Sequence, residues 1–374
     1  MDPDGYFVSI DNSQPRAIGV NGAVTISDVA EGSRSVGLSG ISSACIVSGD
    51  NPRLVTVTSD AGVQTEFQVS CSQPPTTTAV PLLDMGGSGS YHGFGGGLYP
   101  AGRNDPPAAH VSAQPQVNKS QRFAMISVSM SNGAQEFCFS GMGNVGPQDC
   151  TDVSFIGQAT ADPSLHDSLV IVNTAQGSRP APDWDSPSDE TYDVADSQLE
   201  LFGLTPAAVQ VAWIKQANRS PNIGLPNQSA DAYRLLGTLG DIVRALKARY
   251  PNIKQVYLSS RIYSCREGGL NGEPFAYESG FSVKWLIAAQ IEQLASGTVH
   301  PLAGDLGLDV APWIAWGPYL WADGTNPRSD GLVWERGDLA GDCTHPSSLG
   351  QQKVGALLMD FFKSSALTSD WFVR

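Results

Sequence analysis

Near its end the chain carries an aspartate three residues before a histidine, Asp342 and His345. At this spacing the carboxylate lies on the same side of a helical turn, or of a tight loop, as the imidazole. It can then accept the Nδ1–H bond, fix the tautomer of the ring and leave Nε2 free to act as a base. Such a pair is useful only with a nucleophile, so a serine or cysteine elsewhere in the chain must complete the site.

Cys343 lies between these two residues and admits two interpretations. As a thiol nucleophile it would share a turn with its own base and leave little room for a substrate. As the disulfide partner of Cys265 it would hold His345 close to its productive geometry, which small displacements spoil. The disulfide is the favoured interpretation.

Polar or small residues follow three of the expected strands. Ser131 comes after the first strand and can act as a nucleophile whose own N–H lies near a helix start. Gly177 follows the second strand and lets a backbone N–H approach a substrate oxygen closely. Asn218 follows the third strand and offers a side-chain NH₂. The three donors, Ser131, Gly177 and Asn218, would form an oxyanion hole for acyl transfer.

Each of these positions also has a structural interpretation. Ser131 could be a helix N-cap, Gly177 a plain turn residue and Asn218 a loop cap. Three other serines are rival nucleophiles. Ser127 and Ser129 lie inside the expected strand, and Ser178 follows the glycine that fits the oxyanion position.

The elements that must position these residues begin at about residue 121, where strands and helices alternate as in an α/β sheet. The strands expected are 123–130, 168–174, 209–214 and 253–258, and the helices are 229–249, 279–295 and 350–362. The strands are continuous apolar runs, which indicates a parallel sheet covered on both faces. Ligands of such sheets bind at the carboxyl ends of the strands.

Two segments precede this part. Residues 1–75 contain short alternating runs separated by turn residues, among them 22–26, 35–38, 54–58 and 65–71, and predict a small immunoglobulin-like β-sandwich. Residues 76–120 are expected to be a linker, which begins in the run 72–78, followed by a glycine-rich loop (84–100) that packs on the main domain. His92 and His110 could line a site there.

The order of the polar residues resembles that of the SGNH (GDSL-type) hydrolases. This family is named for a Ser, a Gly, an Asn and a His in four sequence blocks, with an Asp three residues before the His. Ser131, Gly177, Asn218 and the Asp342/His345 pair follow that order over residues 121–374. Residues 257–263, 316–321 and 323–334 also resemble secreted bacterial SGNH-like proteins with an N-terminal β domain.

The resemblance implies an SGNH-like, flavodoxin-like three-layer α/β/α domain and a serine esterase. Two positions depart from the family pattern. Met130 stands where the family has the Asp of its Gly-Asp-Ser motif, and Arg219 stands where an Asp often follows the Asn. These departures favour an alternative in which the domain is an inactive carbohydrate-binding or surface protein.

Composition limits the class of protein. The 374 residues are 41% hydrophobic and only 16% charged, with 40 glycines and 25 prolines, which is typical of a soluble, loop-rich globular protein. The net charge of −15 argues against nucleic-acid binding. No apolar run is long enough to span a bilayer. The opening residues lack the charged and apolar regions of a secretory signal, so we expect an export signal to have been removed.

Six cysteines without a C-x-x-C motif favour disulfides and an oxidising compartment, extracellular or periplasmic, over a metal site. The pairs expected are Cys45–Cys71, Cys138–Cys150 and Cys265–Cys343, and the alternative is six reduced core thiols. Neither a metal nor an organic cofactor is expected. The sequence leaves the oligomeric state open.

Two other groups of residues could contact a substrate. Trp313, Trp316, Tyr319 and Trp321 could form a sugar-stacking platform or could pack in the core, and Asn132 is a further candidate contact. Glu273 and Glu278 could be the acid/base pair of a glycosidase, although solvated or capping roles are favoured. The preferred hypothesis is a secreted serine esterase that acts on an acylated carbohydrate, such as an acetylated polysaccharide, or on short-chain esters.

Overall fold

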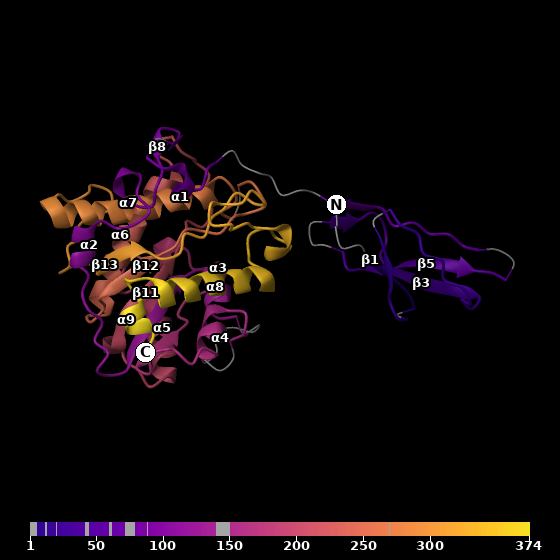
Figure 1. The fold of residues 1–374 in the computed structure, drawn as a ribbon, viewed down its shortest axis with the longest axis horizontal. Coiled ribbons are helices and arrows are strands. Elements are labelled where there is room, and N and C mark those ends of the chain that lie inside the picture. The colour runs from indigo at the N-terminus through magenta and orange to yellow at the C-terminus, as the bar shows by residue number, and fades with distance from the viewer. Residues whose placement is uncertain are drawn as a thin grey trace. The chain divides into compact units, whose positions relative to one another are not determined.

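The computed structural model describes residues 6–11, 13–19, 21–41, 45–59, 62–71, 79–87, 89–139, 150–268 and 270–374. The chain forms two compact units, Met1–Pro74 and Pro75–Arg374, which are described separately. The first is indigo in Figure 1, and the second runs from violet through orange to yellow.

The first unit is an antiparallel β structure. Its four-stranded sheet has the order β2-β1-β3-β5, and β4 pairs with β6. The strands are β1 (Tyr6–Ile10), β2 (Arg16–Ile18), β3 (Gly32–Ser39), β4 (Cys45–Val47), β5 (Arg53–Val57) and β6 (Val69–Cys71). Val36 and Leu38 on β3 and Tyr6 and Val8 on β1 are buried at alternate positions, as the two-residue period of a strand requires.

The sequence interpretation of this unit needs two corrections. Residues 22–26, which were expected to form a strand, have no strand structure, and the run 65–71 forms a strand only at β6. Cys45 and Cys71 lie opposite each other on β4 and β6. The Cys71 side chain and the linker 72–78 lie outside the described residues, so that disulfide and the linker stay predictions, as does the immunoglobulin-like fold.

The second unit is built on a parallel sheet of five strands in the order β10-β9-β11-β12-β13. The strands are β9 (Phe123–Ser129), β10 (Leu169–Val172), β11 (Val209–Lys215), β12 (Gln255–Leu258) and β13 (Trp313–Trp316). In chain order this is 2-1-3-4-5, the order of flavodoxin-like sheets. Every residue of β9, β11, β12 and β13 is buried, so both faces of the sheet are covered.

The helices of this unit fall into two packed groups. One contains α6 and α7, and the other contains α3, α4 and α8. The helices are α1 (Leu82–Met85), α2 (Ala108–Ser112), α3 (Ser131–Phe137), α4 (Phe155–Thr160), α5 (Glu190–Leu201), α6 (Asp231–Arg249), α7 (Phe275–Ser296), α8 (Ser348–Ser364) and α9 (Ser369–Phe372), with 3₁₀ turns η1 (Pro100–Gly102), η3 (Ala181–Asp183), η4 (Pro206–Ala208) and η5 (Arg336–Asp338). The four predicted strands and three predicted helices are all present, and the mixed α/β class with a parallel sheet is confirmed.

The fifth strand, β13, was not predicted from the sequence. It is a four-residue run between Pro312 and Gly317, and both of its tryptophans are buried. The segment before β9 packs beside this strand. The Tyr99 hydroxyl accepts a hydrogen bond from the Trp316 N–H at 3.2 Å, and His110 Nε2 lies 2.9 Å from the Ile314 carbonyl oxygen. His110 is therefore a buried structural residue.

The glycine-rich segment contains a short hairpin, β7 (Ser90–Tyr91) and β8 (Phe94–Gly95). His92 lies at its turn, is exposed and has a φ of 53°. None of the helices in the described ranges combines the length and the hydrophobicity of a bilayer-spanning segment.

Candidate active site

The polar residues singled out in the sequence lie just beyond the carboxyl ends of the strands. Ser131 follows β9 and begins α3, Gly177 follows β10, and Asn218 follows β11. The strand order reverses between β9 and β11, which is where ligands bind in open α/β sheets. The backbone of the second turn is tied to the first strand, because the Gln176 N–H donates to the Ser129 carbonyl at 3.0 Å.

Ser131, His345 and Asp342 form a continuous hydrogen-bonded chain. Ser131 Oγ lies 2.7 Å from His345 Nε2, and His345 Nδ1 lies 2.5 Å from Asp342 Oδ2. Ser131 and His345 are both half-buried, so the hydroxyl remains open to a substrate. A serine, a histidine and an aspartate in this arrangement can carry out nucleophilic acyl transfer with general-base assistance.

Asp342 is held in its ionised form. Partial burial acts to raise its pKa, but hydrogen bonds from the His345 N–H, the His345 ring and the Thr344 N–H together lower the pKa to about 2. The two backbone bonds go to Oδ1 at 3.0 Å, which leaves Oδ2 for the imidazole. A carboxylate held in this way keeps the Nδ1–H tautomer and can stabilise the imidazolium.

The loop that carries Asp342 and His345 is anchored to the segment after β12. Cys265 and Cys343 form the predicted disulfide, and Ser264 Oγ donates to the Cys343 carbonyl at 2.8 Å. Cys343 has a φ of 59°, a left-handed conformation that non-glycine residues adopt only when their surroundings impose it. The predicted Cys138–Cys150 disulfide is also formed.

Gly177 presents its backbone at the surface beside this site. The residue is exposed, its N–H donates to no described residue, and a Cβ added there would meet nothing within 4 Å. The next residue, Ser178, has a φ of 63°. A free N–H at this turn is available to a substrate oxygen.

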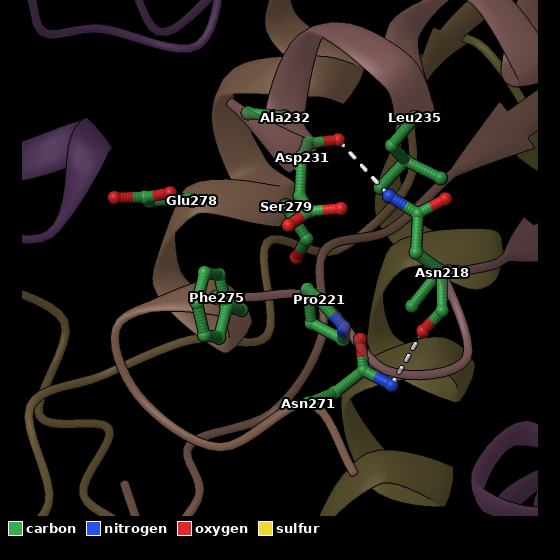
Figure 2. Close-up of a pocket in the computed structure, with 10 residues that line it drawn as sticks. Asn218, Pro221, Asp231, Ala232, Leu235, Asn271, Phe275, Glu278 and Ser279 are labelled. Atoms are coloured by element: carbon green, nitrogen blue, oxygen red, sulfur yellow. Dashed lines mark hydrogen bonds between the residues drawn. The ribbon is translucent and has the colours of Figure 1, made fainter. Parts of the chain in front are cut away.

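Asn218 is buried and oriented by its neighbours. Its Nδ2 donates to the Asp231 carbonyl at 3.0 Å, and its own carbonyl accepts from Asn271 Nδ2 at 2.7 Å, as Figure 2 shows. The second amide hydrogen has no hydrogen-bond partner among the described residues. Asn218 also lines a pocket of about 10 Å³, together with Pro221, Leu235, Phe275 and Glu278.

The rival serines have other partners. Ser127 Oγ donates to Asn173 Oδ1 at 2.7 Å, and Ser129 Oγ donates to the Lys215 carbonyl at 2.5 Å. Both are fully buried. Ser178 is exposed, and neither its hydroxyl nor that of Ser127 or Ser129 contacts a histidine. Of the four serines, only Ser131 is hydrogen-bonded to an imidazole.

The aromatic platform expected for sugars is not present as a surface. Trp313, Trp316, Tyr319 and Trp321 are at most 3% exposed, and the Trp316 ring N–H donates to the Leu98 carbonyl at 2.7 Å. A sugar ring cannot stack on side chains buried in this way, so the core-packing interpretation is the correct one. Asn132 is likewise only 2% exposed and is bonded within the protein.

Glu273 and Glu278 accept hydrogen bonds from interior groups. Glu273 accepts from the Ser264 and Tyr277 N–H groups and from the Trp321 ring, and Glu278 accepts from the Leu225 N–H and the Tyr91 hydroxyl. Burial raises the pKa of each carboxyl to about 7, although these hydrogen bonds oppose the rise. Both side chains therefore serve as internal acceptors in this structure.

The two departures from the SGNH pattern lie in different surroundings. Met130 Sδ is 3.9 Å from the buried Arg261 Nη1. The exposed Arg219 donates to the Ser178 carbonyl at 3.0 Å and lies 3.7 Å from Asp183. Arg219 thus links the turns after β10 and β11 without occupying the site.

A buried ion pair behind the site was not predicted from the sequence. Lys215 Nζ lies 2.5 Å from both carboxylate oxygens of Glu136, and neither side chain is more than 1% exposed. Burial raises the pKa of Glu136 and lowers that of Lys215 to about 8, and the attraction between the two opposes both changes. A lysine closing an apolar strand was the only signal in the sequence, and it did not indicate the partner.

The described residues contain no group of three or more His, Cys, Asp or Glu side chains arranged to hold a metal ion. The chemistry of the site is therefore derived from its own side chains and backbone N–H groups.

No family model and no curated protein matches the chain. Three solved structures align with it at low similarity. A protein from Arabidopsis thaliana aligns with a TM-score of 0.35 and 10% identity, over 65% of this chain and 99% of its own. A carbohydrate esterase described as having divergent catalytic and non-catalytic binding functions aligns with a TM-score of 0.32 and 15% identity, over 67% and 70%.

The third is a carbohydrate esterase family 2 enzyme with a carbohydrate-binding domain, from Corynascus thermopiles (Myceliophthora fergusii). It aligns with a TM-score of 0.31 and 10% identity, over 65% of this chain and 66% of its own. At such scores these likenesses carry no functional argument, and the function of this chain is argued from its own site.

Proposed function

We propose that this protein is a secreted serine ester hydrolase of the SGNH type. The observation that carries the proposal is the unbroken series of hydrogen bonds from Ser131 through His345 to Asp342, at 2.7 and 2.5 Å. A surface or binding protein has no need for a serine hydroxyl, an imidazole and an ionised carboxylate in line. The intact geometry therefore favours an enzyme over the inactive alternative.

In the proposed reaction Ser131 Oγ attacks the ester carbonyl while His345 Nε2 takes its proton. Asp342 orients the ring and stabilises the imidazolium. The oxyanion is bound by the N–H groups of Ser131 and Gly177 and by the second amide hydrogen of Asn218. His345 then protonates the leaving alcohol and activates a water molecule, which hydrolyses the acyl-enzyme and regenerates Ser131.

The substrate that we propose is a short-chain ester, with the acetyl group of a carbohydrate as one example. The pocket beside Asn218 measures about 10 Å³, room for little more than one water-sized group. A long acyl chain would not fit there, whereas the methyl of an acetyl group is of suitable size. The two disulfides of the larger unit support export, because such bonds persist in oxidising compartments.

Labelling with a fluorophosphonate, together with hydrolysis of a p-nitrophenyl ester series and of acetylated polysaccharides, tests the proposal. We expect the wild-type protein to be labelled and Ser131→Ala to lose both labelling and hydrolysis, with kcat lower by about 10⁴-fold or more. Ser178→Ala, which removes the exposed rival hydroxyl, is the control and should keep both. A wild-type protein that is neither labelled nor hydrolytic would leave the inactive binding protein as the better interpretation.

A further inference from the structure

The side chain that follows the proposed nucleophile joins three distant segments. Asn132 Nδ2 donates to the Thr344 carbonyl at 2.5 Å, and Asn132 Oδ1 accepts from Arg261 Nη1 at 3.2 Å. Asn132 belongs to α3, Thr344 to the loop that carries His345, and Arg261 to the segment after β12. The amide is 2% exposed, so both bonds lie inside the protein.

Arg261 is an unusual residue for this place. It is a cation at 2% exposure, and its Nε and Nη2 atoms have no hydrogen-bond partner among the described residues. Its backbone N–H donates to Ser279 Oγ at 3.1 Å, which ties it to α7. Burial lowers the pKa of Arg261 to about 10, while the nearby carboxylates of Glu136, Glu273 and Asp342 oppose this change, so the side chain stays charged at neutral pH.

The Asn132 bond acts on the peptide group that immediately precedes the His345 side chain. The carbonyl of the Thr344–His345 peptide accepts from Asn132, and the N–H of the same peptide donates to Asp342 Oδ1 at 3.0 Å. The plane is therefore held from both edges. A rotation of this plane would swing the imidazole and lengthen the 2.7 Å contact between Nε2 and Ser131 Oγ.

We propose that Asn132 and Arg261 are positioning residues that hold the Thr344–His345 peptide, and with it the His345 ring, in line with Ser131. Neither residue touches the reacting atoms. Arg261 acts through Asn132, because its Nη1–H orients the amide so that Nδ2, and not Oδ1, faces the Thr344 carbonyl. The charge on Arg261 strengthens that bond and fixes the amide against inversion.

This inference rests on the proposed esterase function and is tested with a double-mutant cycle on the full chain. The variants are Asn132→Ala, Arg261→Met and the double variant, assayed for kcat and KM with p-nitrophenyl acetate. We expect each single variant to lower kcat by about 10²-fold, the loss that a small misplacement of a catalytic group causes, with KM within about twofold. Because the two residues act in series, the double variant should lose no more than Asn132→Ala alone.

Two further variants separate positioning from simple packing. Asn132→Asp keeps the contact with Arg261 but turns a carboxylate oxygen toward the Thr344 carbonyl, so kcat should fall as far as in Asn132→Ala. Arg261→Lys keeps a cation that can donate to Asn132 and should recover part of the activity. Gln290→Ala is the matched control, because this fully buried amide donates to the Leu306 and Pro312 carbonyls away from the site. It should lower Tm without lowering kcat.

Losses that add in the double variant, or an Asn132→Ala protein with unchanged kcat, would overturn the positioning role while leaving the esterase intact. A kcat that follows Tm across all variants, Gln290→Ala included, would also overturn it. If Asn132→Ala fails to fold, Asn132→Asp and Arg261→Lys decide the question by the same comparison. A wild-type protein without esterase activity and without fluorophosphonate labelling would instead contradict the proposed function, so the two failures are distinguishable.

Discussion

Among single residues, Gly177 gives the most direct access to the proposed oxyanion hole. A Cβ added at this position would meet nothing within 4 Å, so Gly177→Ala should keep the N–H and retain kcat within about threefold. Gly177→Pro removes the N–H and should lower kcat by about 10²-fold to 10³-fold, which is the usual cost of one oxyanion donor. Both values come from steady-state kinetics with p-nitrophenyl acetate.

The comparison of these two variants controls for effects on the fold. Tm and the circular dichroism spectrum of Gly177→Pro should remain close to those of wild type, because the turn is exposed. Equal activity of the alanine and proline variants would show that the Gly177 N–H does not bind the oxyanion.

The order of residue types in the sequence was enough to bring Ser131, Asp342 and His345 forward as candidates, and the structure places them in hydrogen-bond contact. It could not indicate Asn132 or Arg261 as part of the same arrangement. Their contacts join positions 129 and 212 residues apart, and no local spacing encodes such a meeting. The buried pair of Glu136 and Lys215 was missed for the same reason.

At the scale of elements, the Cys265–Cys343 disulfide fixes the catalytic loop to the end of β12. It spans 78 residues, so in the chain-entropy model its loss should lower the free energy of unfolding by about 4 kcal/mol. We expect Cys265→Ser/Cys343→Ser to lower kcat as well, by about tenfold to 10²-fold, because Cys343 would leave its left-handed conformation. Denaturant unfolding and steady-state kinetics measure the two effects.

The second disulfide of this unit provides the matched control. Cys138 and Cys150 are 12 residues apart, and the same model gives about 3 kcal/mol for their bond. Cys138→Ser/Cys150→Ser should lose stability with a much smaller change in kcat, since the loop of His345 is not touched. An equal loss of kcat in both double variants would mean that stability, and not the geometry of the loop, limits the rate.

The elements that the sequence predicted share a clear pattern. Continuous apolar runs marked β9 to β12, and helical spacing followed by Tyr250-Pro251 marked α6 and its end. The strand expected at 22–26 did not form, because alternation alone does not supply a neighbouring strand to pair with. β13 was missed since its tryptophans are equally typical of a binding surface, and only the packing of 79–120 and α7 shows that they are core.

For the molecule as a whole, Glu273 links stability to pH. Burial raises its pKa from 4.5 to about 7 in the folded protein. Between these two values the folded protein holds a proton that the unfolded chain has released, so a rise in pH favours unfolding. The free energy of unfolding should therefore fall by up to about 3 kcal/mol from pH 4.5 to pH 7, at 1.36 kcal/mol per unit of pKa.

Urea unfolding at intervals between pH 4.5 and pH 8 measures this dependence. Glu273→Gln cannot titrate, and its stability should change less with pH over the same window, whatever its stability at a single pH. The comparison uses the difference in slope, because Glu278 also has a pKa raised by burial and contributes in the same direction in both proteins. Identical slopes would show that Glu273 is ionised throughout this range.

The distance along the chain between Ser131 and His345 has a consequence during synthesis. The two residues are 214 positions apart, and His345 lies just before α8, one of the last elements. A growing chain can thus complete all five strands of the sheet while its serine still lacks a base, and an unassisted serine hydroxyl is a weak nucleophile. Nascent and prematurely terminated chains are therefore latent, and hydrolytic activity arises only when the final thirty or so residues have been made and folded back onto the sheet.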